Sequence, residues 1–240
     1  MPSTLWDIPV AASLLTRLPL PRVPEAAFDD QARTAWAYPL VGVVVGGLAA
    51  MVGALSAGLA PGIAAGLTLA TLLMLTGGLH EDGLADTADG LWGGPTPERR
   101  LEIMKDSRIG AYGVLALILV LGLRWLGLAQ VGWADVIVAA AASRAFMPVL
   151  MAALPHARST GLSHYVGRPT AVNAGIGLLI AAVFAVVLSG GAGLLAMTIA
   201  GLIAFALART ARSKIGGQTG DILGAAQVLT EVAILIALSA

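Results

Sequence analysis

The chain alternates long apolar runs with short polar connections. Seven runs are long enough, or nearly so, to cross a bilayer as helices, which requires about 20 apolar residues. They cover residues 36–59, 62–79, 111–130, 134–154, 172–188, 193–208 and 222–240. The expected fold class is all-α: a polytopic integral membrane protein with about seven transmembrane helices. No internal repeat or linker divides it, so residues 1–240 are expected to form a single membrane-embedded domain.

Composition narrows the class of protein further. The chain is 58% hydrophobic, and its mean hydropathy of +0.86 lies outside the range of soluble proteins. The absence of cysteine excludes disulfides and thiolate chemistry, and the zero net charge argues against a nucleic-acid partner. An early apolar run, residues 5–18, contains Asp7, Pro9 and Arg17. We expect an interfacial or re-entrant segment there rather than a cleaved signal peptide.

The basic residues predict how the chain is oriented. With a cytoplasmic N-terminus, twelve of the fourteen Lys and Arg residues fall in cytoplasmic connections, as the positive-inside rule requires. The exceptions are Arg124, near the outer end of the third run, and Arg144, within the fourth. This orientation brings the polar segments 80–110, 156–170 and 216–221 to one face.

Residues 77–90 are the most informative polar segment. They read Gly-Gly-Leu-His-Glu-Asp-Gly-Leu-Ala-Asp-Thr-Ala-Asp-Gly and place four carboxylates in a chain with only 12% charged residues. In a helix, Asp82, Asp86 and Asp89 project from one face and Glu81 lies about 100° away. Such carboxylates repel each other unless a cation neutralises them, and hard oxygen ligands suit Mg²⁺ or Mn²⁺. We predict that these four residues bind the metal and that the three aspartates are catalytic; a solvated acidic helix start is the alternative.

A second segment follows the carboxylates and contains Lys105, Asp106, Ser107 and Arg108. Its positive charge beside a predicted metal cluster suits a diphosphate. Lys105, Ser107 and Arg108 are therefore candidate substrate ligands, and Asp106 is a further candidate catalytic carboxylate. The alternative is that these basic residues only determine how the chain is oriented in the membrane.

A third polar cluster, Gly-Gly-Gln-Thr-Gly-Asp at 216–221, precedes the last apolar run. Glycines allow a phosphate to approach the backbone, and helix N-termini favour anions. Gln218, Thr219 and Asp221 are thus candidate substrate ligands, although Asp221 could equally cap the helix. Within the last run, Glu231 is ionisable at membrane depth, and Arg144 is its candidate partner in a structural ion pair or a substrate contact.

Taken together, these segments resemble the cobalamin synthase family. The resemblance rests on residues 77–90, 99–113 and 216–225, while residues 15–19 and 38–42 are similar to the family's N-terminal signatures. It implies adenosylcobinamide-GDP ribazoletransferase activity in cobalamin biosynthesis. Adenosylcobinamide-GDP and α-ribazole, or its 5′-phosphate, would give adenosylcobalamin, or its 5′-phosphate, and GMP with the help of Mg²⁺. The resemblance also implies a bacterial inner membrane, with lipid around the helices and the active site facing the cytoplasm.

Other functions share parts of this pattern. A CDP-alcohol phosphotransferase or an aspartate-rich prenyltransferase would use similar metal and phosphate chemistry, but here the pieces of the CDP-alcohol signature overlap, in the wrong order, between Gly78 and Gly90. A small transporter would instead use Arg144 and Glu231 on a midplane pathway. The sequence leaves open the oligomeric state, including a homo-oligomer, and the identity of the general base.

Overall fold

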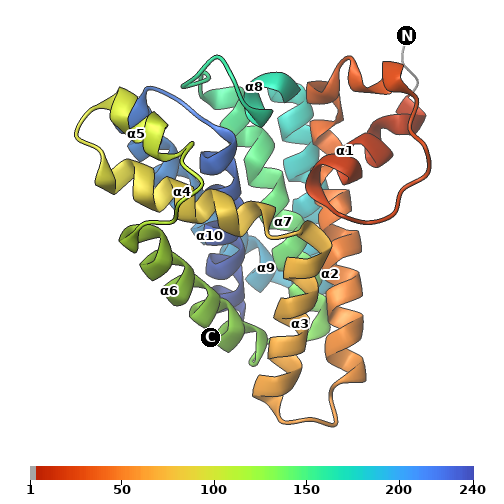
Figure 1. The fold of residues 1–240 in the computed structure, drawn as a ribbon. Coiled ribbons are helices and arrows are strands. Elements are labelled where there is room, and N and C mark those ends of the chain that lie inside the picture. Colours follow the sequence, from red (N-terminus) through yellow and green to blue (C-terminus); the bar gives the residue numbers. More distant parts are fainter. Residues whose placement is uncertain (1–3) are drawn as a thin grey trace.

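The computed structural model describes residues 4–240, and its regular elements are helices (Figure 1). Within that part of the chain there is no β-strand, so the prediction of an all-α fold is confirmed. The α-helices are α1 (Asp7–Leu15), α2 (Tyr38–Leu55), α3 (Pro61–Thr76), α4 (Leu79–Gly93), α5 (Pro97–Ile103), α6 (Ala111–Leu128), α7 (Trp133–Ala153), α8 (Leu162–Val166), α9 (Ala171–Ile215) and α10 (Gly220–Leu238). Short 3₁₀ helices cover Thr4–Trp6, Glu25–Phe28 and Gln31–Ala37.

Five helices are long and apolar enough to cross a membrane: α2 with the preceding 3₁₀ helix, α6, α7, α9 and α10. A sixth crossing is obtained if α3 and α4, bent by 87° relative to each other, count as one span. The sequence predicted about seven runs, and all of them are helical in the structure. The number of predicted runs exceeds the number of candidate spans partly because α9 contains two of the runs.

The 45 residues of α9 do not form one straight helix. Gly190 has non-helical backbone angles, φ 59° and ψ −143°. A Cβ on Gly193 would meet the carbonyl of Ala185, eight residues earlier, so the chain turns back on itself there. The two halves correspond to the predicted runs 172–188 and 193–208.

Small residues hold the bundle together. α7 and α10 are the most buried of the candidate spans, with 78% and 67% of their apolar windows inside the protein. A Cβ on Gly42 of α2 would overlap the backbone of Ala140 in α7. Because lipid chains are as apolar as the side chains, such close van der Waals packing is the main attraction between these helices.

The polar segments gather at one end of the bundle. Figure 1 shows α1, α4, α5 and α8 at this end, whereas α10 finishes toward the other end. Lys214 Nζ donates to Leu91 O at 2.8 Å and Arg100 Nη1 donates to Lys214 O at 2.9 Å, which ties the α4–α5 region to α9. At nine residues, α1 is too short to span a bilayer, in agreement with the expected interfacial or re-entrant segment.

Candidate active site

The acidic segment forms α4, as the spacing of its carboxylates predicted. Gly77 and Gly78 both have left-handed backbone angles, with φ of 65° and 68°, which glycine adopts without steric cost. This turn redirects the chain by 87° from the apolar helix α3 into α4. We therefore treat α3 as the membrane span and α4 as a polar helix that crosses the end of the bundle.

The four predicted metal ligands have two different environments. Asp82 is exposed and Asp86 is half-buried, and no described residue forms a hydrogen bond or ion pair with either. Asp89 instead accepts hydrogen bonds from the backbone N–H groups of Gly110 and Gly113, at 2.7 and 2.9 Å, at the start of α6. Each Asp89 oxygen thus accepts one backbone hydrogen bond and keeps a second lone pair, so the metal-ligand role of Asp89 stays a prediction.

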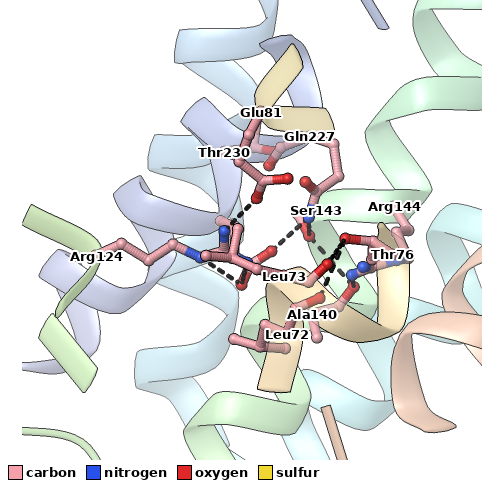
Figure 2. A network of polar contacts seen from close by, with 11 residues as sticks. Leu72, Leu73, Thr76, Glu81, Arg124, Ala140, Ser143, Arg144, Gln227 and Thr230 are labelled. Atoms are coloured by element: carbon pink, nitrogen blue, oxygen red, sulfur yellow. Dashed lines mark hydrogen bonds and ion pairs between the residues drawn. The ribbon is translucent and has the colours of Figure 1, made fainter. Parts of the chain in front are cut away.

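Glu81 lines the same pocket as Asp82 and Asp86 but also belongs to a buried ion-paired group. Its Oε1 lies 2.6 Å from Nη1 of Arg124, and Nη2 of Arg124 lies 2.7 Å from Oε1 of Glu231. All three side chains are buried. Figure 2 shows this ion-paired group between α4, α6, α7 and α10. Glu81 thus fixes α4 to the bundle core, on a different side of the helix from Asp82.

Ser143 and Arg144 of α7 and Gln227 of α10 complete the buried group. The Gln227 amide donates to Ser143 Oγ at 3.0 Å and to Glu231 Oε2, and Arg144 Nη1 donates to Ala140 O at 2.8 Å. The proposed Arg144–Glu231 pair is wrong in detail, because the direct ion-pair partner of Glu231 is Arg124. We call the set of Glu81, Arg124, Ser143, Arg144, Gln227 and Glu231 the core network (Figure 2).

The third polar cluster reaches the same end of α4. A Cβ on Gly83 of α4 would lie 2.9 Å from Asp221 O, so only glycine permits this approach to α10. Arg158 Nη2 lies 3.2 Å from Asp221 Oδ2. The structure therefore brings Asp221 beside the acidic helix, as the predicted topology required. We call Asp82, Asp86 and Asp221 the rim carboxylates.

The rim carboxylates repel one another. Burial, with the charges of Asp221, Asp82 and Asp89, raises the pKa of Asp86 to about 7, while Arg158 acts in the opposite direction. A divalent cation would relieve this repulsion. Within residues 4–240, however, no group of three or more His, Asp or Glu side chains is arranged to hold a metal.

The other predicted ligands of the third cluster form hydrogen bonds within the protein, and their contact with substrate stays a prediction. Thr219 Oγ1 accepts from Ile222 N at 3.3 Å and so caps α10; the alternative that Asp221 is the cap is wrong. Gln218 is buried and its amide contacts His156 Nδ1 at 2.9 Å and Ser163 Oγ. These contacts fix the loop between α7 and α8 against the 216–221 turn.

The second cluster lies beside the rim carboxylates. A pocket of about 570 Å³ is lined by Asp82 and Asp86 on α4 and by Lys105, Asp106 and Ser107 on the α5–α6 connection. Arg108 is exposed and its guanidinium pairs with Asp106 at 2.7 Å. Hydrogen bonds from Arg108 hold the pKa of Asp106 down at about 2, which makes Asp106 a weak proton acceptor. Lys105 is the cation that this connection presents to the pocket.

Sequence reasoning missed Arg124, Arg158, Tyr38 and His80. Arg124 was assigned to the outer end of a span, although a lone arginine in an apolar run signals a buried partner. Arg158 was counted only toward the topology. Tyr38 and His80 line a second pocket beside Asp82 and Asp221; both fall in segments that resemble the family, 38–42 and 77–90, but neither pattern indicates what the side chain does.

An apolar helical bundle that ends in unpaired carboxylates is a membrane protein with a polar site at one end. The family model described as cobalamin-5-phosphate synthase matches residues 7–239. The chain belongs to this family.

Curated relatives agree with the family model. A protein of Bradyrhizobium diazoefficiens named adenosylcobinamide-GDP ribazoletransferase is 46% identical, with 99% of this chain and 95% of the relative covered. Proteins of the same name from Azorhizobium caulinodans and Mesorhizobium japonicum are 43% and 40% identical, covering 97% and 98% of this chain and 94% and 93% of the relatives. No solved structure matches the chain.

Proposed function

We propose that the chain is an adenosylcobinamide-GDP ribazoletransferase of cobalamin biosynthesis. It joins adenosylcobinamide-GDP to α-ribazole, or to α-ribazole 5′-phosphate, and releases GMP. The observation that carries this proposal is the position of the unpaired carboxylates Asp82 and Asp86, which share a pocket with Lys105, in a chain similar over nearly its whole length to transferases of that name.

The reaction exchanges one phosphorus–oxygen bond for another. A ribose hydroxyl of the acceptor attacks the phosphorus attached to cobinamide, and the bond from that phosphorus to the bridging oxygen breaks. GMP leaves with the bridging oxygen and its electron pair. The hydroxyl proton passes to one of the rim carboxylates.

The basic side of the pocket holds the donor. Lys105 is a flexible point charge that offers three N–H donors to the diphosphate, and the Ser107 hydroxyl adds a neutral donor. No cysteine exists, and the chemistry calls for no covalent protein intermediate. The chain's residues therefore orient two substrates and accept one proton.

The carboxylate oxygens at the rim suit Mg²⁺. Protein sites usually hold this ion by one or two carboxylates together with substrate phosphates, so Asp82 and Asp86 suffice, and Asp221 lies nearby. Bound there, Mg²⁺ would neutralise the diphosphate and stabilise the departing GMP. Mn²⁺, which also prefers oxygen ligands, is a plausible substitute. Glu81 and Asp89 stay candidate ligands: Glu81 lines the same pocket and its Oε2 atom has no protein partner, while each Asp89 oxygen keeps a lone pair beside its backbone donor.

The helices span the bacterial inner membrane, in contact with lipid, and the rim carboxylates face the cytoplasm. This orientation is supported by the twelve basic residues that fall on the same side.

Release of GMP tests the proposal. Purified protein in detergent is supplied with adenosylcobinamide-GDP, α-ribazole and Mg²⁺, and GMP and the corrinoid product are quantified together. We expect equal amounts of both products, which stop forming in EDTA and resume when Mg²⁺ is restored. The absence of GMP and product in the complete mixture would overturn the assigned reaction, and full activity in EDTA would overturn the metal.

A further inference from the structure

A second pocket adjoins α4 on the side away from Lys105. It has a volume of about 150 Å³ and lies between α1, α4, α7, α8 and α10. Its apolar wall is formed largely by Leu15, Met147, Met151, Leu162, Val166 and Leu223. The volume falls below the roughly 300–1,000 Å³ of pockets that enclose a drug-sized ligand. The pocket therefore suits a flat bicyclic ring and excludes a corrin macrocycle.

Two polar atoms in this apolar pocket lack partners within the protein. Tyr38 and His80 both line it and are each only 1% exposed. The Tyr38 hydroxyl and the His80 Nε2 atom have no hydrogen-bond partner among the described residues. Buried polar groups are costly when left unsatisfied, so each points to a ligand that supplies the missing partner.

The same pocket includes Asp82, Asp221 and Arg158. Asp82 also lines the pocket that contains Lys105. A ligand seated among the apolar side chains could therefore extend a polar group to the rim carboxylates, where the proposed donor diphosphate lies.

We propose that this pocket binds the base of the acceptor nucleoside. The inference rests on the proposed function, in which the acceptor carries a benzimidazole-type base: a flat, largely apolar bicycle with one unsubstituted ring nitrogen. The apolar wall encloses the ring and the Tyr38 hydroxyl donates to the free nitrogen. The ribose extends toward Asp82 and Asp221, and one of its hydroxyls supplies the partner that His80 Nε2 lacks. Guanine fits less well, because its several polar edge atoms would outnumber the two unpartnered groups.

The test separates acceptor binding from donor binding. Tyr38→Phe removes only the hydroxyl, and Val166→Phe adds bulk inside the pocket. The matched controls are Tyr165→Phe and Val172→Phe, since Tyr165 and Val172 are 77% and 70% exposed and lie outside the pocket. For each purified protein, calorimetry measures the Kd of α-ribazole alone, and kinetics measure the KM of each substrate.

We expect Tyr38→Phe to raise the Kd and KM of α-ribazole by about three- to tenfold, the effect of losing one neutral hydrogen bond. Val166→Phe should raise both by more, while the KM of adenosylcobinamide-GDP stays unchanged in either variant. The control variants should match the wild type.

Two results would overturn the base pocket: unchanged α-ribazole binding in both pocket variants, or an increase in KM confined to the corrinoid substrate. Failure of the proposed function has a different signature, because the wild-type protein would then release no GMP. In that case the calorimetric Kd of α-ribazole still shows whether the pocket binds the base of the acceptor. If Val166→Phe does not fold, Tyr38→Phe alone gives the answer.

Discussion

Glu81 and Asp82 are adjacent in α4, yet they belong to two regions with opposite electrostatics. Glu81 enters the core network, where the protein supplies its own counter-charge from Arg124. Asp82 belongs to the rim carboxylates, where Arg158 pairs with Asp221 and no described residue pairs with Asp82 or Asp86. The core network contains two glutamates and two arginines, whereas the rim has three carboxylates and one arginine.

This difference separates structural from reactive carboxylates. Charges in the bundle core are held only because the protein neutralises them, since desolvation of an unpaired ion is costly. At the rim, water can solvate and a bound cation can neutralise the carboxylates that the protein leaves unpaired. We therefore expect substitutions in the core network to affect folding, and substitutions at the rim to affect turnover.

The largest effect should come from breaking the core network. Arg124→Gln leaves Glu81 and Glu231 buried without their cation, and removing one partner of a buried ion pair costs about 3–5 kcal/mol. The thermal unfolding midpoint in detergent should fall sharply, or the protein should fail to accumulate. Arg22→Gln is the control, because Arg22 is exposed.

A compensated variant sharpens this prediction. Combining Arg124→Gln with Glu81→Gln and Glu231→Gln removes both orphaned charges, and it should recover part of the lost stability because the substitutions are coupled. An unfolding midpoint for Arg124→Gln equal to that of the wild type would show that the core network is not a structural ion pair.

The rim should respond in the opposite way. Asp82→Asn and Asp86→Asn each remove a charge that no protein group pairs, so the unfolding midpoint should stay the same or rise. The rate of GMP release should fall by about 10²–10⁴-fold, the usual contribution of a positioned proton acceptor. Asp29→Asn, at an exposed carboxylate, provides the control. Rates near wild type in both variants at limiting Mg²⁺ would place the chemistry elsewhere.

The smallest effect concerns pH in metal-free protein. Because the pKa of Asp86 is raised to about 7, the folded protein keeps a proton that the unfolded chain loses near pH 4. The resulting stability is present at low pH and is lost as the pH rises through 7. In EDTA, the unfolding midpoint should fall between about pH 4 and pH 7 and level off above, and this fall should be smaller in Asp86→Asn. Identical profiles for the two proteins would contradict the prediction.

The sequence predicted the fold well because apolar run length and residue spacing are local properties. The helices agree with the predicted runs to within a few residues at most boundaries. Asp82 and Asp86 lie one turn apart in a helix, and the predicted topology correctly brought Lys105 and Asp221 to the same end. The double-glycine turn at Gly77 and Gly78 was visible in the sequence only as part of a motif.

The details of the site depend on tertiary contacts that spacing does not encode. Whether Glu81 or Asp82 meets a cation depends on Arg124, 43 residues further along the chain. Asp89 accepts hydrogen bonds from backbone N–H groups at the start of α6, a donor pair created by the fold. Tyr38 and His80 line a pocket only because α7, α8 and α10 pack around them in the folded chain.

The two pockets that meet at Asp82 also constrain the kinetic order of the proposed reaction. One opens toward the α5–α6 connection and the other toward α8, so neither substrate needs to leave before its partner binds. Transfer then takes place in a ternary complex, and the initial-rate plots for the two substrates should intersect rather than run parallel. Parallel plots would instead indicate that GMP leaves and a covalent enzyme intermediate forms before the acceptor binds.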